Sequence, residues 1–316
     1  MRWPCWLPPV SPTIRKRPVR FYLVDRILEM KPRQQIRALK RVSAHDLLIE
    51  DHPTAGAVLA PALVIESLAQ TSAWLILATT GFAQRGVLAG LRHIEVGAPA
   101  PLGSRLDLTS TVDSWSDEAV VFNVEAWRSG ESVLRIEGAL CFLIAADQLE
   151  DPKQTEAHYK ALCSSEDPTL DRPIRNPVTR PVQMPQWAPY DAVVEVVPGA
   201  EATAVKSVVM ADPVFATHFP RCAVMPGVLL LQSIVQVARE LLGASCDAGT
   251  KWRLERIQGA RFRKYVRPGD ELVLRARVRD LGRDEASLTG SAEVGGVGVV
   301  AIRHLVFSRE DGPAAG

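Results

Sequence analysis

The sequence of 316 residues has no excess of charge of either sign and contains few cysteines. Its 37 basic residues are matched by 36 acidic ones, so no overall field favours nucleic acid or a membrane surface as a partner. The five cysteines are odd in number, scattered and without the spacing of metal ligands. We therefore expect a reducing compartment, taken to be the cytoplasm, and neither a disulfide framework nor a metal site.

The chain also lacks an unbroken apolar run at its N-terminus. Prolines interrupt MRWPCWLPPVSPTIRKRPVR where a signal peptide needs continuous apolar residues, so we interpret residues 1–20 as an extension. Two later apolar stretches, 57–82 and 222–242, have the length of membrane spans. Glu66 and Gln70 lie in the middle of the first, and a carboxylate at a bilayer centre is costly. We expect buried core helices and no membrane span.

What the sequence does contain is a repeat. HPTAGAVLAPALVIESLAQ at 52–70 aligns without a gap with HFPRCAVMPGVLLLQSIVQ at 218–236, which lies 166 positions later. The length alone suggests about two domains, and the repeat indicates that one domain is written twice. We expect units at 21–149 and 189–310 and a frayed tail at 311–316. Six prolines and many charges between the units predict a linker at 150–188.

Both units show the same order of predicted elements. Strands are expected at 36–43 and 202–209, and long apolar helices at 61–79 and 226–242. β-branched or alternating apolar segments then predict strands at 87–96, 104–112, 119–128, 132–144, 253–262, 271–278, 286–294 and 298–307. One long helix followed by antiparallel strands predicts an α+β fold with the helix buried against the sheet.

The string H-F-P-x-x-x-V-M-P-G-V-L, which begins at His218, carries a family resemblance. Together with YLVDRILEMKP at 22–32 and ARFRKYVRPGDELVL at 260–274, it resembles the 3-hydroxyacyl-acyl carrier protein dehydratases of the FabA/FabZ type. The resemblance implies a hotdog fold, in which an antiparallel sheet wraps the long helix and two units pair through their sheets. The repeat then implies a double hotdog, an intrachain pseudo-dimer. Whether chains associate further stays open.

The same resemblance implies an activity without a cofactor. It is the conversion of a (3R)-3-hydroxyacyl thioester to a trans-2-enoyl thioester in fatty acid, polyketide or related lipid biosynthesis. The substrate would hang from the phosphopantetheine of an acyl carrier protein, with coenzyme A as the alternative carrier. A base at C2 and an acid at the C3 hydroxyl are needed, and the family takes them from different units. Here they would be His218 and Glu66, which stands at the acid's position, fourteen residues after His52.

Five further positions match the family's supporting residues: Gly227, Val224, Gln70, Phe219 and Pro220. The resemblance implies that the Gly227 N–H, at the start of the helix, polarises the thioester carbonyl. It also implies that the Val224 carbonyl orients the His218 ring. Gln70 would steady Glu66, because residues four apart share one face of a helix.

A second composite site would combine His52 with Gln232, and it is degenerate. A carboxamide gives up no proton near neutral pH, so Gln232 cannot act as the acid. Pro61 stands at the position of Gly227 and has no N–H to donate. We interpret His52 as a structural relic and expect one active site per chain.

A run of basic residues lies between Lys251 and Arg267, with one acid, Glu255. Carrier proteins of this pathway are acidic, so four of these residues are candidates for docking by electrostatic steering: Arg261, Arg263, Lys264 and Arg267. A solvated strand face is the alternative. Two other functions also stay open at this point, a hotdog acyl thioesterase or isomerase and a non-catalytic module that binds carrier protein.

Overall fold

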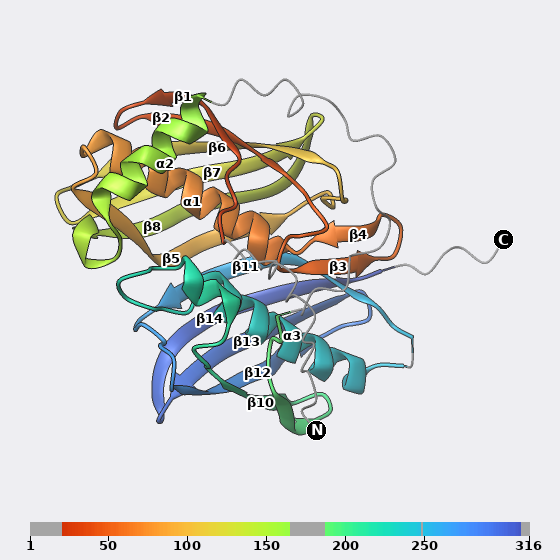
Figure 1. The fold of residues 1–316 in the computed structure, drawn as a ribbon. Coiled ribbons are helices and arrows are strands. Elements are labelled where there is room, and N and C mark those ends of the chain that lie inside the picture. The colour runs from red at the N-terminus through yellow and green to blue at the C-terminus, as the bar shows by residue number, and fades with distance from the viewer. Residues whose placement is uncertain (1–20, 165–186, 248, 311–316) are drawn as a thin grey trace, which may run out of the picture.

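The computed structural model describes residues 21–164, 187–247 and 249–310. Its main feature is one antiparallel sheet of 12 strands, with a long helix lying against each half of the sheet (Figure 1). The strand order is β1-β2-β6-β7-β8-β5-β11-β14-β13-β12-β10-β9. A separate hairpin consists of β3 and β4.

Each half of the chain contributes six strands to the large sheet. Those of the first half are β1 (Arg26–Lys31), β2 (Gln35–Arg41), β5 (Gln84–Val96), β6 (Arg105–Trp115), β7 (Ala119–Arg128) and β8 (Glu131–Ala145). Those of the second half are β9 (Ala192–Val197), β10 (Glu201–Ser207), β11 (Trp252–Phe262), β12 (Glu271–Leu281), β13 (Glu285–Val294) and β14 (Val297–Arg309). The hairpin comprises β3 (Ile49–His52) and β4 (Gly56–Leu59). The helices are α1 (Pro61–Thr79), α2 (Pro152–Ser164) and α3 (Gly227–Ser245), with short 3₁₀ helices at Ala146–Gln148 and Pro213–Ala216.

The strand order reads the same from both edges of the sheet once each strand is matched with its counterpart 166 positions away. The two halves meet where β5 pairs with β11. In this register Ile94 faces Ile257 and Leu91 faces Ala260. Ala260 is the repeat partner of Ile94, and Ile257 is that of Leu91, so exchanging the halves reproduces the junction. The long helices α1 and α3 also contact each other.

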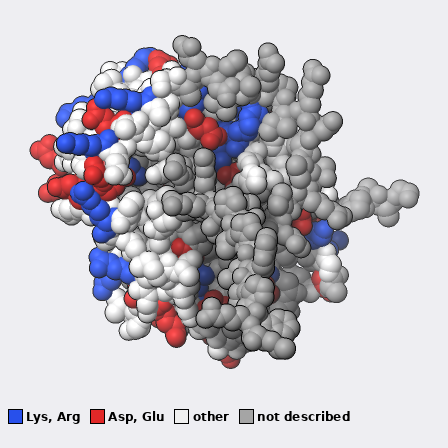
Figure 2. Space-filling model, viewed as in Figure 1, with Lys and Arg blue, Asp and Glu red and all other residues white. Residues whose placement is uncertain are grey.

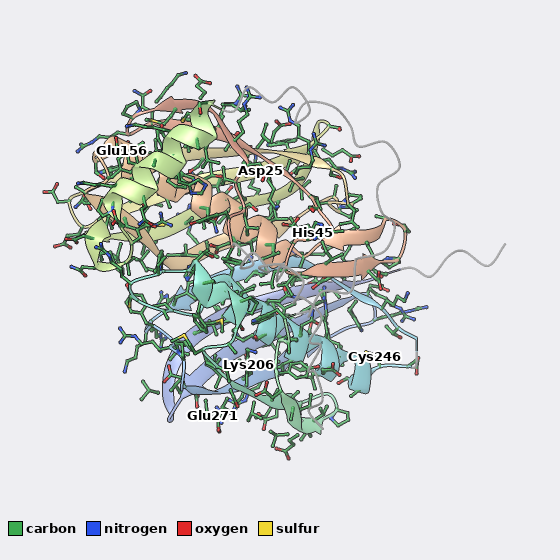
Figure 3. The ribbon with its side chains drawn as sticks, viewed as in Figure 1. Asp25, His45, Glu156, Lys206, Cys246 and Glu271 are labelled. Atoms are coloured by element: carbon green, nitrogen blue, oxygen red, sulfur yellow. The ribbon has the colours of Figure 1, made fainter. Side chains whose placement is uncertain are left out.

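Side-chain hydrogen bonds repeat with the same offset. Asp25 accepts a hydrogen bond from the Arg41 N–H at 2.6 Å, and its partner Asp191 accepts one from the Ser207 N–H at 2.7 Å. Figure 3 marks Asp25 in the first half and the buried Lys206 in the second. Its repeat partner Lys40 is buried as well, although their acceptors differ: Lys206 donates to the Ala188 carbonyl and Lys40 to the Asp46 carboxylate, both at 2.7 Å. The halves therefore share local structure as well as sequence.

Helices α1 and α3 form the core of each half. Both are 19 residues long and apolar enough to cross a membrane by length and composition, but 78% and 67% of the tested windows are buried inside the protein. Fully buried side chains such as Leu63, Ile65 and Ile76 contribute about 1.5–3 kcal/mol each to folding. This burial agrees with core helices. The predicted ends of α1 are correct, whereas α3 begins one residue later than expected, at Gly227, and ends at Ser245.

The segment predicted to be a linker is not irregular throughout, because its first part forms α2. Rings hold this helix against the first half: His158 packs on Tyr22 and Trp74, with centroids 4.4 and 5.3 Å apart. Tyr159 adds contacts to Trp74 and Phe82. Residues 165–186 of the predicted linker, the extension 1–20 and the tail 311–316 lie outside the described residues.

Candidate active site at the junction of the two halves

His218 and Glu66 line the same cavity, although 152 positions separate them in the chain. His218 lies in the loop before α3, and Glu66 lies in the second turn of α1. We call this space, of about 90 Å³, the first cavity. Gln70, Phe219, Val224 and Gly227 also line it, so the structure brings together most residues that the sequence singled out. Pro220 follows Phe219 on the surface and lines a neighbouring cavity.

The His218 ring is fixed in one orientation. Its Nδ1 lies 2.8 Å from the Val224 carbonyl, which can only accept, so Nδ1 carries the proton and Nε2 keeps a free lone pair. Phe219 packs on the ring at 4.2 Å between centroids, and Phe21 packs edge-on at 6.1 Å. Burial lowers the pKa of His218 from 6.5 to about 4, against a smaller opposing effect of the Val224 hydrogen bond. The imidazole is therefore neutral near pH 7 and available as a base.

Glu66 is buried, with 7% of its surface exposed. Gln70 donates from Nε2 to the Glu66 Oε1 at 3.0 Å, and its own amide is held by the backbone of Phe21 and Leu23. Burial raises the pKa of Glu66 above its usual 4.5, while the Gln70 hydrogen bond and the charge of Arg85 lower it by less. The carboxyl group therefore holds its proton to a higher pH than an exposed glutamate, as a general acid requires.

Gly227 is the first residue of α3, and its N–H has no carbonyl one turn back to bond within the helix. A Cβ at this position would lie 2.9 Å from the Phe262 ring, so the site has room for glycine alone unless that ring moves. Pro61 occupies the matching position at the start of α1 and offers no N–H. The first cavity thus has a backbone donor that its counterpart lacks.

Arg85 is a site residue that the sequence analysis did not single out. It lines the first cavity, forms an ion pair with Glu150 at 2.9 Å, and lies over the Phe219 ring at 5.4 Å from its centroid. Its positive charge lowers the pKa of both His218 and Glu66. Glu150 belongs to the predicted linker, so no local pattern indicated this pair.

The degenerate residues lie elsewhere. His52 and Pro61 line a second cavity of about 570 Å³. Gln232 is buried, and its Nε2 donates to the Glu50 Oε1 at 2.6 Å. Gln236 and Arg239 donate to the same carboxylate, each at 3.1 Å. Glu50 has no polar counterpart in the other half, where Ala216 stands at its position, and the sequence analysis missed it.

The His52 ring has the opposite proton arrangement to His218. Its Nδ1 accepts from the N–H groups of Thr54 and Ala55, both at 3.3 Å. When the ring is neutral, its proton therefore resides on Nε2, the atom that serves as the free base in His218. This is a further loss, beyond the missing acid and the missing N–H.

The basic run does not form one patch beside one cavity. Lys264 lines the first cavity, whereas Lys251 and Arg253 line the second. Arg253 pairs with Glu255 at 2.6 Å, and Arg256 pairs with Glu285 at 3.0 Å. On the described part of the face in Figure 2, basic and acidic side chains are likewise interspersed.

Comparison with known proteins identifies relatives of the second half. The FabA-like domain family matches residues 188–303. The 3-hydroxyacyl-[acyl-carrier-protein] dehydratase FabZ of Bordetella pertussis is 42% identical over 113 residues, covering 34% of this chain and 75% of the relative. The FabZ of Thiobacillus denitrificans is 38% identical over 149 residues, covering 42% of this chain and 97% of the relative.

Solved structures resemble the chain over nearly its whole length. A protein with a hot dog fold from Alicyclobacillus acidocaldarius covers 93% of this chain and 98% of its own, with a TM-score of 0.51 and 10% identity. The 12:0-ACP thioesterase of Umbellularia californica covers 87% and 94%, with a TM-score of 0.52 and 7% identity. At such low identity the likeness shows the fold alone, and that fold is the hotdog.

Proposed function

The chain belongs to the family of 3-hydroxyacyl-[acyl-carrier-protein] dehydratases of the FabA/FabZ type, and we propose that its first cavity removes water from a 3-hydroxyacyl thioester. One observation carries the proposal. A neutral histidine with a free Nε2 and a glutamate with a raised pKa, supplied by different halves of the chain, line one cavity. These are the base and the acid that dehydration needs.

The steps follow from the positions of these groups. His218 Nε2 takes the proton from C2, and the electron pair moves towards the thioester carbonyl, whose oxygen accepts a hydrogen bond from the Gly227 N–H. The electrons then form the C2–C3 double bond as the C3–O bond breaks, and Glu66 protonates the departing hydroxyl to give water. The proton on His218 returns to Glu66 after product leaves. No net proton is gained or lost.

The arrangement of the repeat supports a tandem double hotdog with both units in one chain, extending over 21–149 and 189–310. In this proposal the first unit supplies the acid and the second supplies the histidine, so neither is active alone. The curated relatives are named for substrates on acyl carrier protein, and we infer the same carrier here. Lys264, on the wall of the first cavity, is the best placed of the candidate docking residues.

The proposed function is tested with 3-hydroxybutyryl-pantetheine as substrate, with enoyl absorbance and free thiol followed in parallel. A rise in enoyl absorbance without thiol is the expected result. Release of thiol would instead identify a thioesterase. No change in either signal, in a protein that still binds acyl carrier protein, would identify a binding module.

A further inference from the structure

The second cavity repeats the first one position by position. Eighteen residues line the first cavity, and all of them except Glu66, Ala69 and Cys141 have their repeat partner, 166 positions away, on the wall of the second. The space has nevertheless not closed. It measures about 570 Å³ against about 90 Å³, within the roughly 300–1,000 Å³ that is usual for small-molecule sites.

The catalytic positions of the second cavity are blocked by interactions within the protein. The Glu50 carboxylate accepts hydrogen bonds from Gln232, Gln236 and Arg239, so its oxygens are occupied by partners within the protein. His52 carries its proton on the wrong nitrogen for a base when neutral, as described above. A substrate in this cavity therefore meets neither the acid nor the base of the first cavity at the matching positions.

Part of the apolar wall, in contrast, is kept, although Arg239 and Arg253 stand where the first cavity has Ala73 and Val87. Aligned pairs that stay apolar in both cavities include Val58 with Val224, Leu59 with Met225, Val64 with Leu230, and Leu254 with Leu88. Along the end of β5 and the loop after it, side chains are smaller than in the first cavity. Val96, Ala98 and Pro99 stand where the first cavity has Phe262, Lys264 and Tyr265. These replacements make room.

The charges on the second cavity favour a neutral ligand. Three basic residues (Arg239, Lys251, Arg253) and three acidic ones (Glu50, Asp51, Glu310) line it, so neither sign dominates. Arg239 is already paired with Glu50, and Arg253 with Glu255. An apolar wall with a mixed polar border suits a long apolar chain attached to an uncharged, hydrogen-bonding arm.

From these observations we propose that the second cavity is a binding site for an acyl-pantetheine thioester, which it holds without dehydrating. The ligand class rests on the proposed function of the first cavity, whose wall the second repeats. One chain then binds two acyl groups and converts one of them.

The test uses decanoyl-pantetheine, which has no 3-hydroxyl group and cannot be dehydrated, and measures binding by calorimetry. The matched variant is Val96→Phe with Pro99→Tyr, which writes the narrower wall of the first cavity into the second. We expect two ligand molecules to bind each full chain and, in this variant, one of the two to bind at least about tenfold more weakly, equivalent to about 1.4 kcal/mol. Ala98→Trp is the second variant, used if the first fails to fold.

Dehydration of 3-hydroxybutyryl-pantetheine is measured on the same preparations and is expected to be unchanged, because none of the altered residues lines the first cavity. Two undiminished sites in a folded variant, or fewer than two sites in the parent chain, would overturn the inference while leaving dehydration to be judged separately. Binding that the variant loses, in a chain that never dehydrates, would keep the ligand site and refute the proposed function instead.

Discussion

At the scale of single residues, burial is the largest cause of the shifted pKa values of the two proposed catalytic groups. Burial favours the uncharged form of any ionisable group, so it lowers the pKa of His218 and raises that of Glu66. Both groups are thereby brought to the protonation state that their proposed roles require. The repeat partners, His52 and Gln232, have lost this arrangement through different local hydrogen bonds.

Substitution of His218 and Glu66 should show that the first cavity, and not the second, carries the turnover. We expect His218→Ala and the isosteric Glu66→Gln each to lower turnover of 3-hydroxybutyryl-pantetheine by roughly 10²–10⁴-fold, the usual contribution of a general base or acid. His52→Ala and Gln232→Ala are the matched controls and should leave turnover nearly unchanged. Equal loss from His52→Ala in a folded protein would mean that the second cavity is catalytic.

The pH dependence of kcat/KM should reflect the shifted groups. His218 must be unprotonated, so activity should rise as pH increases through about 4 rather than through the ordinary 6.5 of histidine. Glu66 must be protonated, so activity should fall as pH rises through its pKa, which lies above 4.5. An acid limb near 6.5 in a pH titration of kcat/KM would show that His218 is not held neutral by burial.

Some site residues were predictable from sequence and others were not. The pairing of His218 with Glu66 follows from the register of the repeat. Glu50 lies 182 positions from Gln232, and Arg85 pairs with a residue of the predicted linker. Such contacts are decided by how the chain packs, and no local spacing encodes them.

At the scale of elements, the long helices α1 and α3 were the most predictable features. Each is a long apolar run that begins at a proline or glycine, and the prediction for α1 is correct at both ends. The edge strands β1 and β9 and the β3–β4 hairpin were not predicted, and neither was α2. The hydropathy of α2 is low, and the helix lies in a proline-rich segment, so its sequence did not predict a helix. Ring contacts with Trp74 and Phe82 hold it in place.

The environment of α3 predicts the effect of restoring its missing acid. Gln232→Glu would place a second carboxylate about where the amide now donates to Glu50 at 2.6 Å. Repulsion between the two should lower the melting temperature at pH 8 and less so at pH 5, where one of them takes up a proton. Thermal unfolding at both pH values measures this.

A second substitution should relieve the repulsion between Glu50 and the introduced carboxylate. Glu50→Ala, which introduces the residue found at the matching position Ala216, should recover stability in the Gln232→Glu background. The double variant should still add little turnover, because Pro61 removes a carbonyl donor of the kind whose loss costs roughly 10²–10³-fold. An unchanged melting temperature in Gln232→Glu at pH 8 would show that Glu50 is not held against this side chain.

At the scale of the whole molecule, the fold joins the two halves around one cavity, the proposed catalytic site. The continuous sheet across β5 and β11 and the contact of α1 with α3 bring residues of both halves to one cavity. The proposed composite site therefore lies within a single chain. The second half has Gln232 at the position of Glu66, and the first half has Pro61 at the position of Gly227. One composite site therefore keeps both the acid and the N–H donor, and the other has neither.

Mixing two inactive variants tests most directly whether the active site is formed within a single chain. Chains that carry His218→Ala and chains that carry Glu66→Gln are denatured together, refolded together and assayed for enoyl formation from 3-hydroxybutyryl-pantetheine. Each intact site needs both residues from one chain, so we predict that the mixture stays as inactive as its components, while the unaltered protein regains its turnover after the same treatment. Substantial turnover in the mixture would mean that His218 of one chain works with Glu66 of another, and would contradict the intrachain site.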